Sequence, residues 1–226
     1  MAIGLIGGTG YASTIYYYRQ LNEMLRKNTF NKAQDIVLYS LDFQYYKYLA
    51  EEKAISRLED YLLQGGQSLS RAGVDSVALL AVTLHKWAGL IERETGLSVI
   101  HIGDSIIKGI FSKGMETILF LGTRPGMEEG FITDWFSHKG IHVVTPNPKQ
   151  RLHLHEYIYQ YLTVEHTTSK GQELLTSLVR DYEDKVDGIV LGCTELPMAF
   201  ASIKTNKPVF SSTDLHIKDI FNHLIS

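Results

Sequence analysis

The chain has 226 residues, 44% hydrophobic and 21% charged, a composition typical of a soluble globular protein with one large domain or two small ones. Its 22 basic and 25 acidic side chains give a formal charge of −3 without a basic block, which argues against nucleic-acid binding. The start, MAIGLIGG, does not resemble a signal peptide, and no run reaches the roughly 18 apolar residues of a membrane span. A single cysteine excludes an intrachain disulfide. We therefore expect a cytoplasmic protein without a membrane or nucleic-acid partner.

Short apolar runs alternate with longer stretches of helical period, which is the pattern of parallel α/β folds. The expected strands are 2–7, 35–41, 75–81, one near 98–101, 116–121, 141–145, 187–192 and 208–210.

Two helical stretches have recognisable ends. Ser13 is expected to cap a helix whose apolar side holds Ile15, Tyr18, Leu21 and Leu25. A second stretch runs from about Lys47 to Ala72 and is expected to stop at Gly73, with Gly65 and Gly66 as a point of division.

The chain contains nearly the same segment twice, VDSVALLAVT at 74–83 and VDGIVLGCTE at 186–195. Aligned without a gap, these segments pair Ala81 with Cys193, the only cysteine. A second similarity, between IGLIGGTG near the start and ILFLGTRPG at 118–126, pairs Thr9 with Thr123. The sequence therefore predicts two similar halves, 1–103 with 208–226 and 104–207. The break is expected between Gly103 and Gly114, and the last segment is expected to return to the first half as a strand and a helix.

The strand ends are where we expect a ligand, because open parallel sheets bind ligands beyond the carboxyl ends of their strands. Cysteine is often only a small apolar core residue. In GCTELP, however, Cys193 lies between a strand and a helix start, where backbone amides and the helix dipole favour a thiolate. Cys193 is therefore the candidate nucleophile or base.

Threonine stands at or beside four equivalent strand ends, at Thr9, Thr83, Thr123 and Thr194. Each could be an ordinary helix cap. Hydroxyls and free amides at helix starts also bind carboxylates, so we interpret the set as a cradle for a small acid.

The histidines do not form a recognisable metal motif. His153 and His155 are two residues apart, a spacing that separates them on a helix, and neither a second cysteine nor an HExxH pattern is present. We predict no metal site. His85, two residues past Thr83, could lie near the site or cap the helix that follows. The glycines Gly7, Gly8 and Gly10 match the dinucleotide fingerprint only weakly.

Five segments together resemble the aspartate/glutamate racemase family, the cofactor-independent amino-acid racemases. They are GLIGGTGYASTIYYYRQLNE (4–23), LYSLDF (38–43), TLHK (83–86), LGTR (121–124) and, the most specific, GCTE (192–195). The resemblance implies two pseudo-symmetric, Rossmann-like α/β domains with parallel-sheet cores and the active site in the cleft between them. It also implies a homodimer without pyridoxal phosphate or metal, acting on a small acidic amino acid or related carboxylate.

The family mechanism places one cysteine from each half on opposite faces of the substrate's α-carbon, so that one removes a proton and the other returns one. Cys193 matches the second-half cysteine. Ala81 stands at the first-half position, and Val82 stands where the family usually has an asparagine that holds the carboxylate. Because Ala81 and Val82 both differ from the family pattern, we interpret Ala81 as natural rather than engineered. Ser211 also replaces a frequent aspartate. A methyl group cannot transfer a proton, so symmetric two-thiol racemisation is not expected.

The resemblance thus implies Cys193 as the catalytic residue and a substrate contacted by Thr9, Ala81, Val82, Thr83, Thr123 and Thr194. His85 and Glu195 are possible auxiliaries. Arg151 or His153 could replace a lysine that some relatives carry. Three functions stay open: a weak or one-sided racemase, a one-cysteine decarboxylase or isomerase of the same superfamily, and a catalytically silent amino-acid-binding protein.

Overall fold

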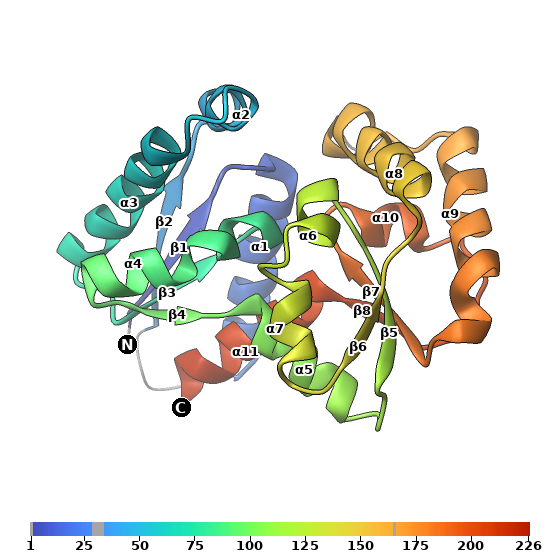
Figure 1. The fold of residues 1–226 in the computed structure, drawn as a ribbon. Coiled ribbons are helices and arrows are strands. Elements are labelled where there is room, and N and C mark those ends of the chain that lie inside the picture. Colours follow the sequence, from blue (N-terminus) through green and yellow to red (C-terminus); the bar gives the residue numbers. More distant parts are fainter. Residues whose placement is uncertain (1, 29–33, 165) are drawn as a thin grey trace. The chain divides into compact units, whose positions relative to one another are not determined.

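A computed structural model describes residues 2–28, 34–164 and 166–226 (Figure 1). The chain divides into two compact units, of which unit 1 runs to His101 and includes Ile217–Ser226, and unit 2 is Ile102–His216. In the described residues each unit contains one four-stranded parallel sheet with flanking helices, so the predicted α/β class is confirmed. No helix in these ranges is both long enough and apolar enough to cross a membrane.

Unit 1 is built in chain order from β1 Ala2–Gly7, α1 Tyr11–Asn28, β2 Asp35–Ser40, α2 Phe43–Glu51, α3 Ile55–Arg71, β3 Ser76–Leu79, the 3₁₀ helix η1 Val82–Trp87, α4 Ala88–Thr95 and β4 Ser98–Ile100. Its strand order is β2-β1-β3-β4.

Unit 2 contains α5 Ile102–Phe111, β5 Thr117–Gly122, α6 Arg124–Glu128, α7 Thr133–Ser137, β6 His142–Val144, α8 Pro148–Gln160, η2 Leu162–Val164, α9 Ser169–Tyr182, η3 Glu183–Lys185, β7 Gly188–Gly192, α10 Leu196–Phe200 and β8 Val209–Ser211. The last helix, α11 Ser212–Ile225, begins in unit 2 and ends in unit 1. The strand order β6-β5-β7-β8 repeats that of unit 1, as the duplicated segments predicted.

The two faces of the unit 1 sheet are covered by different helices. One face packs against α3 and α4 and carries Ile6, Val77 and Leu79. The other packs against α1 and the end of α11 and carries Ile3, Leu5 and Ala78. Successive residues of a strand point to opposite faces, so β1 and β3 are apolar apart from the buried Ser76, because both of their faces are buried.

Two expectations about the connection between the halves are corrected. The strand at 209–211 does not return to the first half but pairs with β7 in the second sheet, where Leu191 lies opposite Ser211. Only Ile217–Ser226 belongs to unit 1, because the apolar residues that pack there come from the second half of α11. The expected break at 103–114 is largely the helix α5.

The first helix was predicted, but its start and the first half of its buried side were not. It begins at Tyr11, so Ser13 lies inside the first turn, where its hydroxyl donates to the carbonyl of Gly10 at 2.8 Å. Leu21 and Leu25 are buried as expected, whereas Ile15 is 60% exposed and Tyr18 47% exposed, because Tyr17 takes the core position instead.

The second helical stretch is divided at 52–54 rather than at its paired glycines. Both glycines lie inside α3. A Cβ at Gly65 would come within 2.9 Å of the Tyr39 ring, and a Cβ at Gly66 would lie 3.2 Å from the Ile91 side chain. Both glycines therefore permit close helix packing. The predicted stop at Gly73 is confirmed, with a positive φ of 78°.

The aspartate repeated in the two duplicated segments ties neighbouring strands together. Asp75 accepts the backbone N–H of Ala2 at 3.1 Å, at the start of β1. Asp187 accepts those of Glu116 and Thr117 at 3.1 and 2.8 Å, at the start of β5. The two aspartates thus have the same structural role in each unit.

Asp187→Asn is expected to destabilise the protein at neutral pH and progressively less under acid conditions. The two backbone hydrogen bonds lower the pKa of Asp187 below its ordinary value. Its stabilising contribution is therefore present above the unfolded pKa of about 3.9 and disappears as the pH falls through the lower native pKa. Urea unfolding at pH 7 and near pH 3 measures the difference. The exposed neighbour Asp184, replaced by asparagine, is the control, and an equal gap for Asp187→Asn at both pH values would contradict the assignment.

Candidate functional site

Cys193 directly follows β7, the strand of the second sheet that lies between β5 and β8. Every residue of β7 is buried, and the Cys193 side chain is 8% exposed. A central, fully packed strand fixes the backbone just before the cysteine, so the thiol has a defined position at the carboxyl edge of the sheet.

The glycine before the cysteine is required by an aromatic ring. A Cβ at Gly192 would overlap the ring of Phe120, which is fully buried in β5. The paired residue Gly122 is similarly close, since its Cβ would lie 2.9 Å from the carbonyl oxygen of Gly192. Sequence reasoning missed this positioning role of Phe120 and Gly192, although a glycine at both strand ends was the available signal.

The Cys193 thiol is held by the carboxylate of Glu195. Its Sγ donates to Glu195 Oε2 at 3.0 Å, and the Thr194 hydroxyl donates to the same oxygen at 2.7 Å. Burial raises the pKa of Cys193 well above its ordinary value, and the nearby negative charge of Glu195 raises it further. Backbone hydrogen bonds from Glu195 and Thr194 act in the opposite direction but are outweighed.

The expectation that this position favours a thiolate is therefore corrected. The helix that follows, α10, has only five residues and supplies a weak dipole, whereas burial of the thiol and the neighbouring, partly exposed Glu195 carboxylate both favour the protonated form. Cys193 rests as a thiol, the form that can donate a proton.

Glu195→Gln is expected to make Cys193 more reactive toward a thiol reagent such as iodoacetamide. The neutral amide removes the charge that raises the thiol pKa, so the rate profile should move to lower pH. Alkylation rates from pH 6 to 10 measure the shift. Glu173→Gln, an exposed charge removal on α9, should leave the profile unchanged, and an unmoved profile for Glu195→Gln would contradict the coupling.

Thr123 lies at the equivalent end of the neighbouring strand β5. It is 9% exposed, precedes α6, and its side chain makes no capping hydrogen bond to that helix. The next residue, Arg124, donates its backbone N–H to His155 Nδ1 at 3.3 Å. Burial lowers the pKa of His155, which keeps the ring neutral and able to accept this bond.

Arg151 and His153, which were candidates to replace a lysine that some relatives carry, both lie on α8. Arg151 is held by Glu128, with Nε 2.9 Å from the carboxylate, and donates to the carbonyl of Pro146 at 2.9 Å. His153 is exposed and lines a separate pocket between α8 and α9. Arg151 thus has a structural role in joining α8 to α6.

In unit 1 the chain after β3 is fixed by a histidine. Ala81 is extended and partly exposed, and Val82 is buried at the start of η1. His85 is 4% exposed, and its Nδ1 donates to the carbonyl of Ala81 at 3.0 Å. Its ring also packs edge-on against His101, with 4.7 Å between centroids. His85 therefore fixes the backbone of Ala81, just after the end of β3.

Thr9 lies in the loop after β1, next to this segment. Gly8 turns the chain with a φ of 95°, in a place where a Cβ would overlap the backbone of Leu41, and its N–H donates to Thr14 Oγ1 at 2.9 Å. Since β1 and β3 are paired, with Leu80 N–H donating to the carbonyl of Ile6, the loop that carries Thr9 and the start of η1, which carries Thr83, follow neighbouring strands at the same sheet edge.

Each unit by itself thus brings its predicted residues to the carboxyl edge of two adjacent strands: Thr9 with Ala81, Val82 and Thr83 in unit 1, and Thr123 with Cys193 and Thr194 in unit 2. Within the described ranges no group of three or more histidine, cysteine or acidic side chains is arranged to hold a metal ion.

Comparisons with known proteins indicate one family of relatives over nearly the whole chain. Residues 6–220 match the model of the Asp/Glu/Hydantoin racemase family. The broad-specificity amino-acid racemase RacX of Bacillus subtilis (strain 168) is 23% identical over 220 residues, which cover 93% of this chain and 92% of the relative. A candidate Asp/Glu racemase from Yersinia pestis has a TM-score of 0.90 and 30% identity, covering 100% of this chain and 99% of that structure. An aspartate racemase homologue from Pyrococcus horikoshii OT3 has a TM-score of 0.82 and 28% identity, covering 100% and 99%.

Proposed function

Because the chain belongs to the Asp/Glu/Hydantoin racemase family, we propose that it transfers a proton at the α-carbon of a small acidic amino acid, without pyridoxal phosphate, using Cys193. The observation that carries the proposal is the buried Cys193 thiol, hydrogen-bonded to Glu195 at the end of the central strand β7. The amino-acid racemase from Bacillus subtilis supports the reaction class. The aspartate racemase homologue supports an acidic substrate.

Glu195 is the proposed proton partner of the thiol. Its Oε2 lies 3.0 Å from Sγ, so the thiol proton can pass to the carboxylate and leave a thiolate. The thiolate then takes the substrate α-proton, and the C–H electron pair moves into the enediolate of the substrate carboxylate. While the enediolate is bound, the S–H proton exchanges with solvent, and the same sulfur then delivers a solvent-derived proton to the same face of the carbon. Glu195 finally gives its proton back to the thiolate, which restores the resting thiol.

The proposed reaction is one-sided. The Ala81 methyl group cannot donate a proton to the opposite face, and His85 already donates Nδ1–H to the Ala81 carbonyl. A water molecule is then the remaining candidate for the second proton donor, and it is a weaker acid than a thiol. We therefore expect hydrogen exchange with retention of configuration to be faster than inversion.

The substrate carboxylate is proposed to bind the hydroxyls of Thr83, Thr123 and Thr194, together with the amides around Thr9 and Val82. Thr123 supports this role, because its side chain is not used to cap α6. Hydroxyls and strand-end amides hold a carboxylate without a positive charge. Ala81 and Val82 supply the apolar part of the same proposed contact surface.

The test is α-hydrogen exchange in deuterated water, followed by NMR for both enantiomers of aspartate and glutamate, with circular dichroism recording rotation in parallel. The expected result is deuterium incorporation that outpaces loss of rotation. Neither exchange nor loss of rotation with any of the four substrates would overturn the proposal.

A one-cysteine decarboxylase is the second candidate function. The observation that favours it is that Cys193 rests protonated, because such an enzyme needs a thiol that protonates one face of an enediolate left by loss of carbon dioxide. Release of carbon dioxide from disubstituted malonates, without α-hydrogen exchange of amino acids, would select this function.

We also propose a cytoplasmic homodimer, on the basis of the family and, for the compartment, the use of a single unpaired cysteine. Sedimentation equilibrium of the purified chain tests the assembly, and a mass of one chain at micromolar concentration would exclude the dimer.

A further inference from the structure

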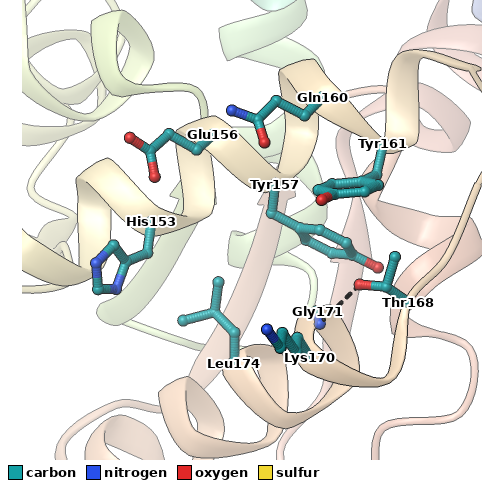
Figure 2. A pocket seen from close by; sticks show the side chains of 9 residues that line it. All are labelled: His153, Glu156, Tyr157, Gln160, Tyr161, Thr168, Lys170, Gly171 and Leu174. Carbon is teal, nitrogen blue, oxygen red and sulfur yellow. Dashed lines mark hydrogen bonds between the residues drawn. The ribbon is translucent and has the colours of Figure 1, made fainter.

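A pocket of about 410 Å³ lies between α8 and α9 of unit 2 (Figure 2). Polar and aromatic side chains line it together, namely His153, Glu156, Tyr157, Gln160, Tyr161, Thr168, Lys170, Gly171 and Leu174. None of these residues belongs to the strand-end set that holds Cys193. The volume is in the range of small-molecule sites.

The start of α9 forms one end of this pocket. Thr168 caps the helix, and its hydroxyl accepts the N–H of Gly171 at 3.1 Å. The amides of Ser169 and Lys170, in the same first turn, are left without an acceptor in the described part of the chain. The first turn of a 14-residue helix presents such N–H groups and a partial positive charge to an anion.

A buried tyrosine supplies the second, independent observation. Tyr157 is 5% exposed, and its phenol lies directly against Gly171, where a Cβ would overlap the ring. Figure 2 shows its hydroxyl directed toward Thr168 at the start of α9. Among the described residues this hydroxyl has no hydrogen-bond partner. Buried hydroxyls are normally paired, so an oxygen of a bound molecule would complete its hydrogen bonding.

The charges and apolar groups indicate how a ligand would be oriented. The exposed Lys170 stands on the first turn of α9, and its ammonium group can bind a phosphate or carboxylate as a point charge. Glu156 lies on α8 and, in Figure 2, at the other end of the pocket from Thr168. An anionic group is therefore favoured at the α9 end. Tyr161 and Leu174 offer an apolar wall for the body of the molecule.

We propose that the α8–α9 pocket binds a small organic anion, a carboxylate or phosphate joined to an aromatic body. The anionic group meets the first-turn amides of α9, Lys170 and the Tyr157 hydroxyl. This site is separate from the proton-transfer function proposed for Cys193 and does not depend on it.

Isothermal titration calorimetry of the full chain tests the site with four probes: benzoate, phenyl phosphate, inorganic phosphate and the neutral benzamide. Benzoate or phenyl phosphate is expected to bind in saturable fashion at millimolar concentrations or below, and benzamide at least tenfold more weakly. Benzoate and phenyl phosphate together distinguish the carboxylate source from the phosphate source. Binding of inorganic phosphate as tight as that of phenyl phosphate would overturn the role of the aromatic body.

Two variants locate the binding. Lys170→Gln should weaken it about tenfold, and Tyr157→Phe, which keeps the ring on Gly171, about fivefold. Lys113→Gln removes the same charge from an exposed position of unit 2 outside the pocket and should change nothing. Cys193→Ser should also bind the probe normally. No binding of any probe, equal binding of benzoate and benzamide, or equal effects of Lys170→Gln and Lys113→Gln would each overturn the proposal.

Discussion

Cys193→Ala is expected to lower the rate of α-hydrogen exchange by about 10²- to 10⁴-fold, the range for loss of a positioned acid–base group. Cys193 is the only thiol in the chain, and its proposed proton partner Glu195 has no direct path to the α-carbon without it. The side chain that remains is smaller and apolar, in a site that is already buried, so the fold should persist. NMR exchange rates in deuterated water, with thermal unfolding as the check on folding, measure the effect.

Cys193→Ser separates an enzyme from a silent binding protein. Serine can still donate to Glu195, so the local geometry is kept, but its hydroxyl is a far weaker acid than a thiol. If the protein is an enzyme, affinity for aspartate or glutamate persists while exchange is lost. If wild type and Cys193→Ser bind equally and neither exchanges hydrogen, the chain is a binding protein and the catalytic proposal is wrong.

The central strands β1, β3, β5 and β7 were predictable because they are mainly apolar runs buried on both faces, a pattern that few other structures produce. All of the expected strands are present in the described residues, and the repeated segments occupy equivalent places in the two sheets. The buried side of α1 was not predictable. Tyr16, Tyr17 and Tyr18 are consecutive, so the sequence offers two overlapping apolar sides, and packing against the sheet selects Tyr17.

The location of the candidate site was predictable, but the state of its cysteine was not. A strand end before a helix start gives the position of Cys193 from local sequence alone. Its protonation depends on burial and on the Glu195 side chain folding back toward Sγ, neither of which is visible in the GCTE string. The division of the second helical stretch at 52–54 was missed for a related reason. Lys53 adopts a positive φ of 53°, a conformation that a lysine does not predict.

Gly192→Ala is expected to destabilise the protein by roughly 3 kcal/mol, at the upper end of the usual range for overpacking. The added methyl group would overlap the ring of Phe120, which is 0% exposed and packs against Phe136 with 5.9 Å between ring centroids. The ring can therefore yield only by displacing other core groups. Because Gly192 precedes Cys193, the same shift should move the thiol and reduce exchange even in the folded fraction. Urea unfolding at pH 7 measures the stability.

Gly89→Ala is the matched control, because Gly89 lies exposed in α4 with no atom within 4 Å of an added Cβ. Alanine is the better helix former, so this variant should be unchanged or up to about 1 kcal/mol more stable. Phe120→Ala in a double variant removes the obstructing ring. Although that change alone costs about 3–5 kcal/mol, the additional cost of Gly192→Ala should then nearly vanish. If the two costs simply add, contact with Phe120 is not the reason for glycine beside Cys193.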